Sequence, residues 1–265
     1  MDRTKSRRRP RPQAKAGTPG QASSAKTPQL WLWGIHPVTA ALANPDRPCN
    51  ELRLAREVPD DLVKAAAERG LESVTTDRRE LDRLLGADSG HQGVALSVDP
   101  LPGRQVGEIK LAPPDRILVL DQVTDARNFG AILRSAACFG VGAVVVQSKH
   151  AAAANGACAK AAAGALEKIP IYEVVNLART LTQLKGWGYW IYALDAAAET
   201  PLERWQPGEQ SVLVIGAEGH GIRPLLRARA DQDVAIPIGP AMESLNVSVS
   251  AGIALYALAR ARSRP

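Results

Sequence analysis

The chain has 265 residues, of which 45% are hydrophobic and 23% are charged, a balance typical of a globular protein large enough for two domains. No apolar run approaches the roughly 20 residues needed to cross a bilayer, and the charged start at 1–9 does not resemble a secretory signal. We therefore expect a cytoplasmic protein with no membrane partner.

The net charge of +6 is confined to the first 28 residues. They hold eight basic residues and one acidic residue, so 29–265 carry a net charge of −1. Residues 1–28 also lack the apolar side chains that offset the entropy of ordering, which predicts a disordered basic tail. Such a tail suits RNA, because contacts with phosphates release condensed counterions. A tail that only improves solubility is the alternative.

Residues 29–100 alternate short apolar runs with helical stretches bounded by Gly, Pro or Asp, which predicts a small α/β domain. In chain order we expect a helix at 36–43, a strand at 51–56, a helix at 60–69, a strand at 73–76, a helix at 78–85 and a strand at 93–98. Residues 101–114 are proline-rich and without periodicity, which predicts an interdomain linker.

Residues 115–265 are expected to form a second α/β domain with a mostly parallel sheet. Several of its strands are continuous apolar runs, which is typical of parallel strands covered by helices on both faces. The expected strands are 116–121, 143–147, 169–174, 189–195, 211–216 and 233–238. The Ala-rich stretch 151–165 predicts loop and helix without a chemical role, since alanine is the strongest helix former.

The three cysteines are widely spaced and fit no zinc-binding pattern. We expect Cys49, Cys138 and Cys158 to be buried reduced thiols, and we expect neither a metal site nor a disulfide.

A first polar segment follows the first strand of the second domain. Asn128 and Gly130 lie near the start of the next helix, and Arg134 lies about one turn beyond Gly130. A cation held there by a polar neighbour can bind a phosphate or a reacting oxygen. An ordinary capped helix with a solvated arginine is the alternative.

A second segment, Gly216-Ala-Glu-Gly-His-Gly221, follows a buried strand. Its glycines permit positive φ and the close approach of a flat ligand, and backbone groups there can bind an adenine edge. Glu218 is placed to orient a cation or a hydroxyl. The glycine spacing differs from the G-x-G-x-x-G of dinucleotide sites, which disfavours NAD. A simple strand-to-helix turn is the alternative.

A third segment joins Ile236-Pro-Ile to Ser244-Leu-Asn-Val-Ser248 before the last helix. Ser244 and Asn246 are capping residue types, and capping accounts for one of them. Pro237 would interrupt a central strand, so we expect this strand to end where its backbone serves a ligand.

In their order and spacing, the three segments closely resemble the motifs of the SpoU (TrmH-like) family of RNA 2′-O-methyltransferases, within the SPOUT class. The motifs extend over nearly all of 115–265. Residues 29–100, with Gly34-Ile-His-Pro-Val and His91-Gln-Gly-Val, are more weakly similar to the substrate-binding domain of the subgroup that methylates a guanosine in 23S ribosomal RNA.

This resemblance implies a deep trefoil knot, a homodimer whose active site draws on both subunits, and S-adenosylmethionine as methyl donor. The donor-binding residues would be Gly216, Ile236 and Leu245, largely through backbone groups. The catalytic and RNA-contacting residues would be Asn128, Arg134, Glu218, Ser244 and Asn246.

The role of Arg134 and the identity of the substrate each have an alternative. Arg134 is the general base in the mechanism proposed for the family, but a guanidinium stays protonated. The alternative is that Arg134 only stabilises the forming alkoxide while water takes the proton. The substrate expected from the resemblance is 23S ribosomal RNA rather than DNA. A transfer RNA substrate and a non-catalytic, ribosome-associated RNA-binding protein are the alternatives.

Overall fold

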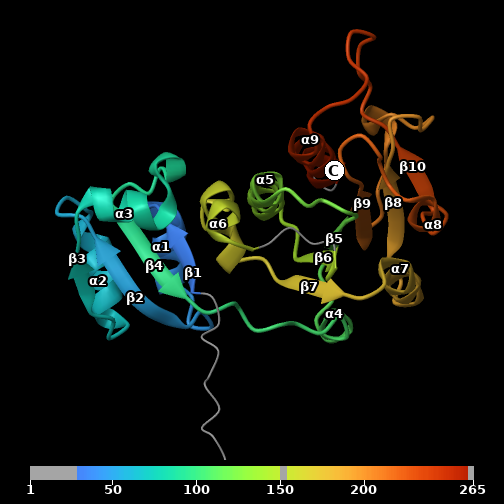
Figure 1. Ribbon diagram of the computed structural model, residues 1–265. Helices are drawn as coiled ribbons and strands as arrows, with labels where there is room; N and C mark the ends of the chain where they lie inside the picture. Colours follow the sequence, from blue (N-terminus) through green and yellow to red (C-terminus); the bar gives the residue numbers. More distant parts are fainter. Residues whose placement is uncertain (1–28, 150–153, 262–265) are drawn as a thin grey trace, which may run out of the picture.

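The computed structural model describes residues 29–149 and 154–261. The tail 1–28, expected to be disordered, lies outside the described residues. Figure 1 shows two α/β units, with helices α5 and α6 of the second unit on the side that faces the first.

The first unit is built on a four-stranded sheet in the order β1-β4-β2-β3. β4 pairs antiparallel with β1 and β2, and β2 pairs parallel with β3. The strands are β1 (Leu30–Trp33), β2 (Cys49–Leu54), β3 (Ser73–Thr75) and β4 (Val94–Val98), and the helices are α1 (Ile35–Ala43), α2 (Asp60–Glu68), α3 (Arg78–Leu85) and the 3-10 helix η1 (Ala87–Ser89).

The elements expected in this unit are present with ends shifted by at most two residues, but β1 was not expected. It is a run of four residues whose strand conformation depends on pairing with β4, where Leu32 lies opposite Leu96. A partner more than 60 positions away leaves no local signal in so short a run.

The second unit contains a six-stranded sheet in the order β10-β8-β9-β5-β6-β7. All five strand pairs are parallel, which confirms the expected α/β class with a mostly parallel sheet. Its strands are β5 (Arg116–Leu120), β6 (Ala143–Gln147), β7 (Ile171–Val174), β8 (Trp190–Leu194), β9 (Ser211–Ile215) and β10 (Gln232–Val234).

Helices cover both faces of this sheet. Leu118 and Leu120 of β5 pack in one apolar cluster with the helices α5 and α9, whereas Ile117 and Val119 pack in a second cluster with α7 and α8. Because side chains alternate between the faces of a strand, coverage on both sides requires the continuous apolar runs seen in the sequence.

The helices of the second unit are α4 (Glu108–Leu111), α5 (Ala126–Cys138), α6 (Gly156–Ala162), α7 (Leu177–Gly186), α8 (Pro224–Arg227) and α9 (Val247–Ala261), with the 3-10 helices η2 (Ala165–Glu167) and η3 (Leu202–Arg204). None of the described helices is long and apolar enough to cross a membrane.

Two expectations about chain segments were wrong in detail. The strand expected at 233–238 ends at Val234, so Pro237 lies in the loop beyond it, and β10 is an edge strand. The segment 101–114, expected to lack periodic structure, contains α4, whose Ile109 is buried in the second apolar cluster.

The cysteines differ in exposure, which corrects the expectation that all three are buried. Cys158 is buried, and burial raises the pKa of its thiol to about 12. Cys49 is half-buried and Cys138 is exposed. The buried face of α5 is formed by Phe129, Ile132, Leu133 and Ala136, and Cys138 falls on the opposite side because two residues advance a helix by about 200°.

The helix α6 of the Ala-rich segment contacts the first unit, whereas 151–153 of that segment lie outside the described residues. A Cβ atom on Gly156 of α6 would overlap the Trp33 ring of β1, so the two units meet at van der Waals distance there. Lys160 Nζ donates to Gly90 O and Gln92 Oε1, each at 2.8 Å. Small side chains in the described part of this segment, 154–165, therefore allow the two units to pack closely.

A buried ion pair joins the units beside this contact. Arg47 Nη2 lies 2.6 Å from Glu167 Oε1, and the two side chains are only 2% and 3% exposed. Asn44 Nδ2 donates to the other carboxylate oxygen at 2.9 Å, and Arg47 Nη1 donates to Asp99 O at 3.0 Å. These hydrogen bonds satisfy the buried charges, as a desolvated pair requires.

We expect Arg47→Ala to lower the free energy of unfolding by about 3–5 kcal/mol, because it leaves the Glu167 carboxylate buried and unpaired. Lys64→Ala is the control, since Lys64 and its partner Asp61 are both exposed, and it should cost at most about 0.5 kcal/mol. Urea unfolding followed by circular dichroism measures both. Equal stability of the two variants would show that the buried pair does not hold the units together.

Candidate active site

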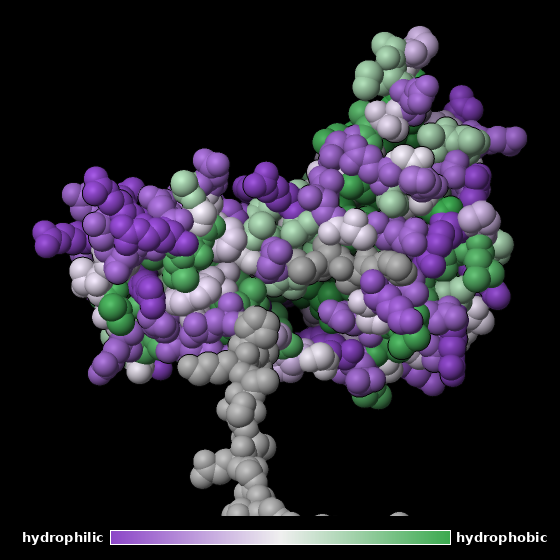
Figure 2. Space-filling view, viewed as in Figure 1, coloured by the Kyte–Doolittle hydropathy of each residue, from purple (hydrophilic) through white to green (hydrophobic). Residues whose placement is uncertain are grey.

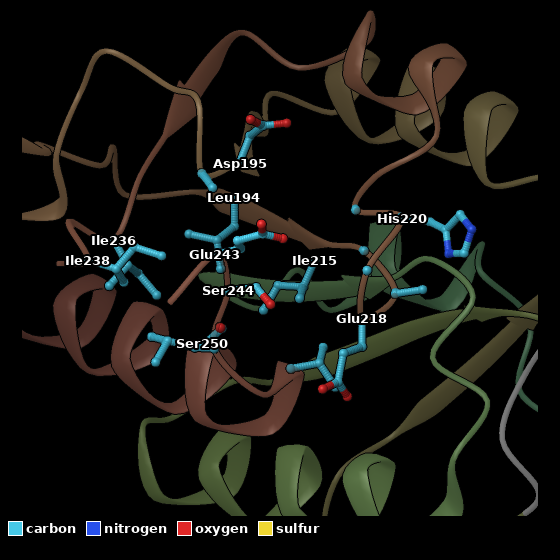
Figure 3. Close-up of a pocket in the computed structure, with 17 residues that line it drawn as sticks. Leu194, Asp195, Ile215, Glu218, His220, Ile236, Ile238, Glu243, Ser244 and Ser250 are labelled. Carbon is cyan, nitrogen blue, oxygen red and sulfur yellow. The ribbon is translucent and has the colours of Figure 1, made fainter. Parts of the chain in front are cut away.

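A cavity of about 310 Å³ opens at the carboxyl ends of β8 and β9. Its walls come from the end of β8, the glycine-rich loop after β9, the segment that follows β10, and the first turn of α9 (Figure 3). In open parallel sheets, ligands bind outside the carboxyl ends of the strands, so the position of the cavity is itself consistent with a binding site.

The glycine-rich loop turns back over the end of its own strand. Gly221 N donates to Ala217 O at 3.0 Å, and Gly219 and Gly221 have φ of 82° and 63°. A Cβ atom on Gly216 would overlap the backbone of Gly221 and Ile222. Gly216 is therefore required for this close backbone approach, and Gly219 and Gly221 for the positive φ of the turn.

A buried carboxylate fixes the far end of the same loop. Asp121, fully buried directly after β5, accepts hydrogen bonds from Arg223 N at 3.0 Å and Arg223 Nε at 2.8 Å, and it lies 2.7 Å from Arg223 Nη2. Arg223 Nη2 also donates to Gln147 Oε1 at 2.8 Å. The loop is thus tied to the ends of both β5 and β6.

Asp121 and Arg223 were not among the residues expected at the site. They are 102 positions apart in the chain, and neither occurs in a spacing that predicts chemistry. The available signal was a charged residue at the end of an apolar strand, where a carboxylate is buried only if it is paired.

The third segment meets the first beside the cavity. Asn246 Nδ2 donates to Asn128 Oδ1 at 3.2 Å. Asn246 precedes α9, and its Oδ1 accepts from Ser248 N at 2.9 Å, as the side chain of an N-cap residue does. Capping therefore accounts for Asn246, whereas α5 is capped by Asp125, which accepts from Asn128 N at 2.8 Å.

Most of the expected site residues are close together. Of these expected residues, the ones that line the cavity are Gly216, Glu218, Ile236, Ser244 and Leu245, and Figure 3 shows Glu218 and Ser244 on different walls of it. Asn128 and Asn246 are joined to each other but do not line it.

Arg134 is the exception. It is exposed on α5 and does not line the cavity, and its side chain has no hydrogen-bond or ion-pair partner within 29–149 and 154–261. Gly130 of the same segment has a packing function, because a Cβ atom there would overlap Cys158 O and press against Ala161 of α6.

The charged side chains of the cavity wall are acidic. Asp195, Glu218 and Glu243 line it, and none of the described lining residues is Lys or Arg. Asp195 is paired with Arg227 Nη1 at 2.7 Å, and the pKa of Arg227 is raised, chiefly by its hydrogen bond to Asp233 and further by Asp195. Glu218 and Glu243 have no such partner among the described residues, so the cavity suits a cationic ligand with an apolar part.

The described part of the chain holds no group of three or more His, Cys, Asp or Glu side chains that could bind a metal ion. His220 lines the cavity, but its neighbours in the loop are glycines.

Known protein families match both units. The profile of the SpoU rRNA methylase family matches residues 115–256, and the profile for RNA 2′-O ribose methyltransferase substrate binding matches residues 31–103. The 23S rRNA (guanosine-2′-O-)-methyltransferase RlmB of Ralstonia nicotianae is 38% identical over 239 residues, which cover 88% of this chain and 96% of that protein.

An uncharacterised tRNA/rRNA methyltransferase of Mycobacterium bovis is also 38% identical, over 77% of this chain, but the match spans only 65% of that relative's length. Among solved structures, the SpoU methyltransferase AviRb of Streptomyces viridochromogenes in complex with AdoMet has a TM-score of 0.75 at 20% identity, covering 89% of this chain and 91% of that one. At this identity the likeness shows a common fold.

The closeness of Gly216 to the returning loop yields a prediction. Gly216→Ala should displace the loop, lower the free energy of unfolding by about 1–3 kcal/mol, and weaken the binding of S-adenosylmethionine measured by calorimetry. Gly208→Ala is the control, because a Cβ atom there meets nothing within 4 Å. Unchanged binding in Gly216→Ala would remove the loop from the ligand site.

Proposed function

Because the chain belongs to the SpoU rRNA methylase family, we propose that it transfers a methyl group from S-adenosylmethionine to a ribose 2′-hydroxyl, that of a guanosine in 23S ribosomal RNA, in the cytoplasm. The observation that carries the proposal is the meeting of the second and third sequence motifs at one acidic cavity, with Asn128 of the first motif bonded to Asn246 beside it.

The charge and the apolar lining of the cavity suit the donor. S-adenosylmethionine carries a positive sulfonium and a flat adenine, and the wall offers the unpaired carboxylates of Glu218 and Glu243 together with apolar side chains. Gly216, Ile236 and Leu245 would hold the donor largely through backbone groups. The two wall segments after β9 and β10 would be threaded through each other as the trefoil knot of the family.

The transfer moves one methyl group and one proton. The bound donor supplies an electrophilic methyl, so that a C–O bond to the ribose forms as the C–S bond breaks and sulfur keeps the electron pair. The protein must align the hydroxyl with the methyl and stabilise the negative charge that develops on oxygen. Asn128, Glu218, Ser244 and Asn246 are in or next to the cavity and would hold the ribose and the donor in line.

Arg134 would stabilise that charge or bind a neighbouring phosphate. A guanidinium has five donors and stays protonated, so we assign the proton to water rather than to Arg134.

A homodimer accounts for the position of Arg134 outside the cavity of its own chain. On α9, Val249, Ile253 and Tyr256 are exposed at 48%, 39% and 50%, and their i, i+4, i+7 spacing makes one apolar stripe. We propose that this stripe packs against a second copy, which brings Arg134 of one subunit to the cavity of the other.

Relatives and charge bear on the choice of RNA. A match of one unit to a substrate-binding profile and the identity to the Ralstonia enzyme support ribosomal RNA. Transfer RNA is the second candidate, since the TrmH/SpoU tRNA modifying enzyme of A. aeolicus is 26% identical with a TM-score of 0.51, over 60% of this chain.

Residues 29–100 carry eight basic and twelve acidic residues, so the binding of RNA phosphates would depend on the basic tail 1–28 and on the second unit.

Mapping of 2′-O-methyl groups in ribosomal and transfer RNA from cells with and without the gene tests this function. We expect one guanosine mark in 23S RNA to disappear and to return when the purified protein and S-adenosylmethionine are added to the unmodified RNA. A mark lost only from transfer RNA would establish the alternative substrate. No lost mark, together with no binding of the donor, would favour a non-catalytic RNA-binding protein.

A mixed-dimer experiment tests the role of Arg134. Arg134→Ala should lower kcat by about 10²-fold or more. The rates are measured at a donor concentration well below the Kd of Gly216→Ala, so that the weakened cavity of that variant stays empty. If Arg134 serves the partner's cavity, dimers reassembled from equal amounts of the two variants should recover roughly a quarter of the wild-type rate, since about half of them are mixed and each has one intact site. No recovery, with mixed dimers shown by mass spectrometry, would place Arg134 and the cavity in the same subunit.

A further inference from the structure

The side-chain amide of Asn246 has a defined orientation. Two donors face its Oδ1: Ser248 N at 2.9 Å and Ser248 Oγ at 2.6 Å. An amide nitrogen in that position would point its hydrogens at the backbone N–H of Ser248, which can only donate. The oxygen of Asn246 is therefore held toward Ser248, and Nδ2 is directed away from α9.

This orientation passes to Asn128. Asn246 Nδ2 donates to Asn128 Oδ1 at 3.2 Å, so Asn128 uses its oxygen as the acceptor and keeps its NH₂ group for another partner. Among the described residues, Asn128 Nδ2 donates to nothing. Its backbone is fixed separately, by the bond from Asn128 N to Asp125, so the free NH₂ group is presented from an anchored position.

We propose that Ser248 is a positioning residue for methyl transfer: its hydroxyl and backbone N–H orient Asn246, and Asn246 orients Asn128 as a hydrogen-bond donor toward an oxygen of the RNA. The identity of that acceptor rests on the proposed function. In the reaction, the NH₂ group of Asn128 donates to the ribose 2′-oxygen or to an adjacent phosphate oxygen, either of which is an acceptor that carries negative charge in the transition state.

The first test needs neither donor nor RNA. In the ¹⁵N-labelled full chain, the side-chain NH₂ signals of Asn128 and Asn246 are assigned with Asn128→Asp and Asn246→Asp, and their exchange with solvent is measured. We expect slow exchange for Asn246 and fast exchange for Asn128. Ser248→Ala removes one of the two donors to Asn246 Oδ1, so it should speed the exchange of Asn246 by about 2- to 10-fold.

The second test measures turnover. Ser248→Ala should lower kcat by a similar factor of about 2- to 10-fold, with unchanged KM values for donor and RNA, because Ser248 itself touches neither. Ser248→Thr keeps the hydroxyl and should restore kcat. Thr182→Val is the matched control. It removes a hydroxyl on α7 that donates to Ala178 O of the same helix. Because α7 does not line the cavity, this variant should leave kcat unchanged.

Wild-type exchange and kcat in Ser248→Ala would overturn the proposal, as would equal losses in Ser248→Ala and Ser248→Thr. Asn128→Asp tests the donor role, since it keeps an oxygen for Asn246 but replaces the NH₂ group by oxygen. Full activity in that variant would also overturn the proposal. If the wild-type chain transfers no methyl group, the proposed function fails, but the exchange rates still decide whether Ser248 orients the two amides.

Discussion

The bond between Asp121 and Arg223 is the interaction on which the geometry of the site depends. Asp121 lies at the end of β5 and is fully buried, while Arg223 closes the glycine-rich loop that follows β9. A buried carboxylate without this partner would cost several kcal/mol, so the loop cannot open without a large loss of stability. α5 begins at Ala126, five residues after Asp121, where Asp125 caps it.

The architecture of the sheets could be predicted from local patterns to a large extent. Continuous apolar runs identified the strands of the parallel sheet, because both faces are covered. The sequence did not predict β1 or α4, whose conformations depend on distant partners. β1 is stabilised by its pairing with β4, and α4 by the burial of Ile109 in the second apolar cluster. The length of β10 was overestimated because apolar residues continue past Val234 into the loop that lines the cavity.

The site could be predicted as a set of residues but not as a geometry. Spacing and family resemblance indicated Gly216, Glu218 and Ser244, which share one cavity. The sequence did not show why position 216 requires glycine. The requirement follows from the backbone of Gly221, which lies where a Cβ atom of residue 216 would be. The two bonds from Ser248 to Asn246 could not be inferred from the sequence, since Ser at a helix start has several equivalent partners. The exposed position of Arg134 agrees with the alternative weighed for the first segment, a solvated arginine on a capped helix.

The contact between the two units has a consequence for the proposed function. Trp33 packed on Gly156 and Arg47 paired with Glu167 join the first sheet to α6 and η2, and α6 packs on the helix that carries Asn128. Two parts joined in this way keep a constant separation. If the first unit binds one feature of the folded RNA, only a nucleotide at a fixed distance from that feature can reach the cavity. The spacing between the two units would then select the nucleotide.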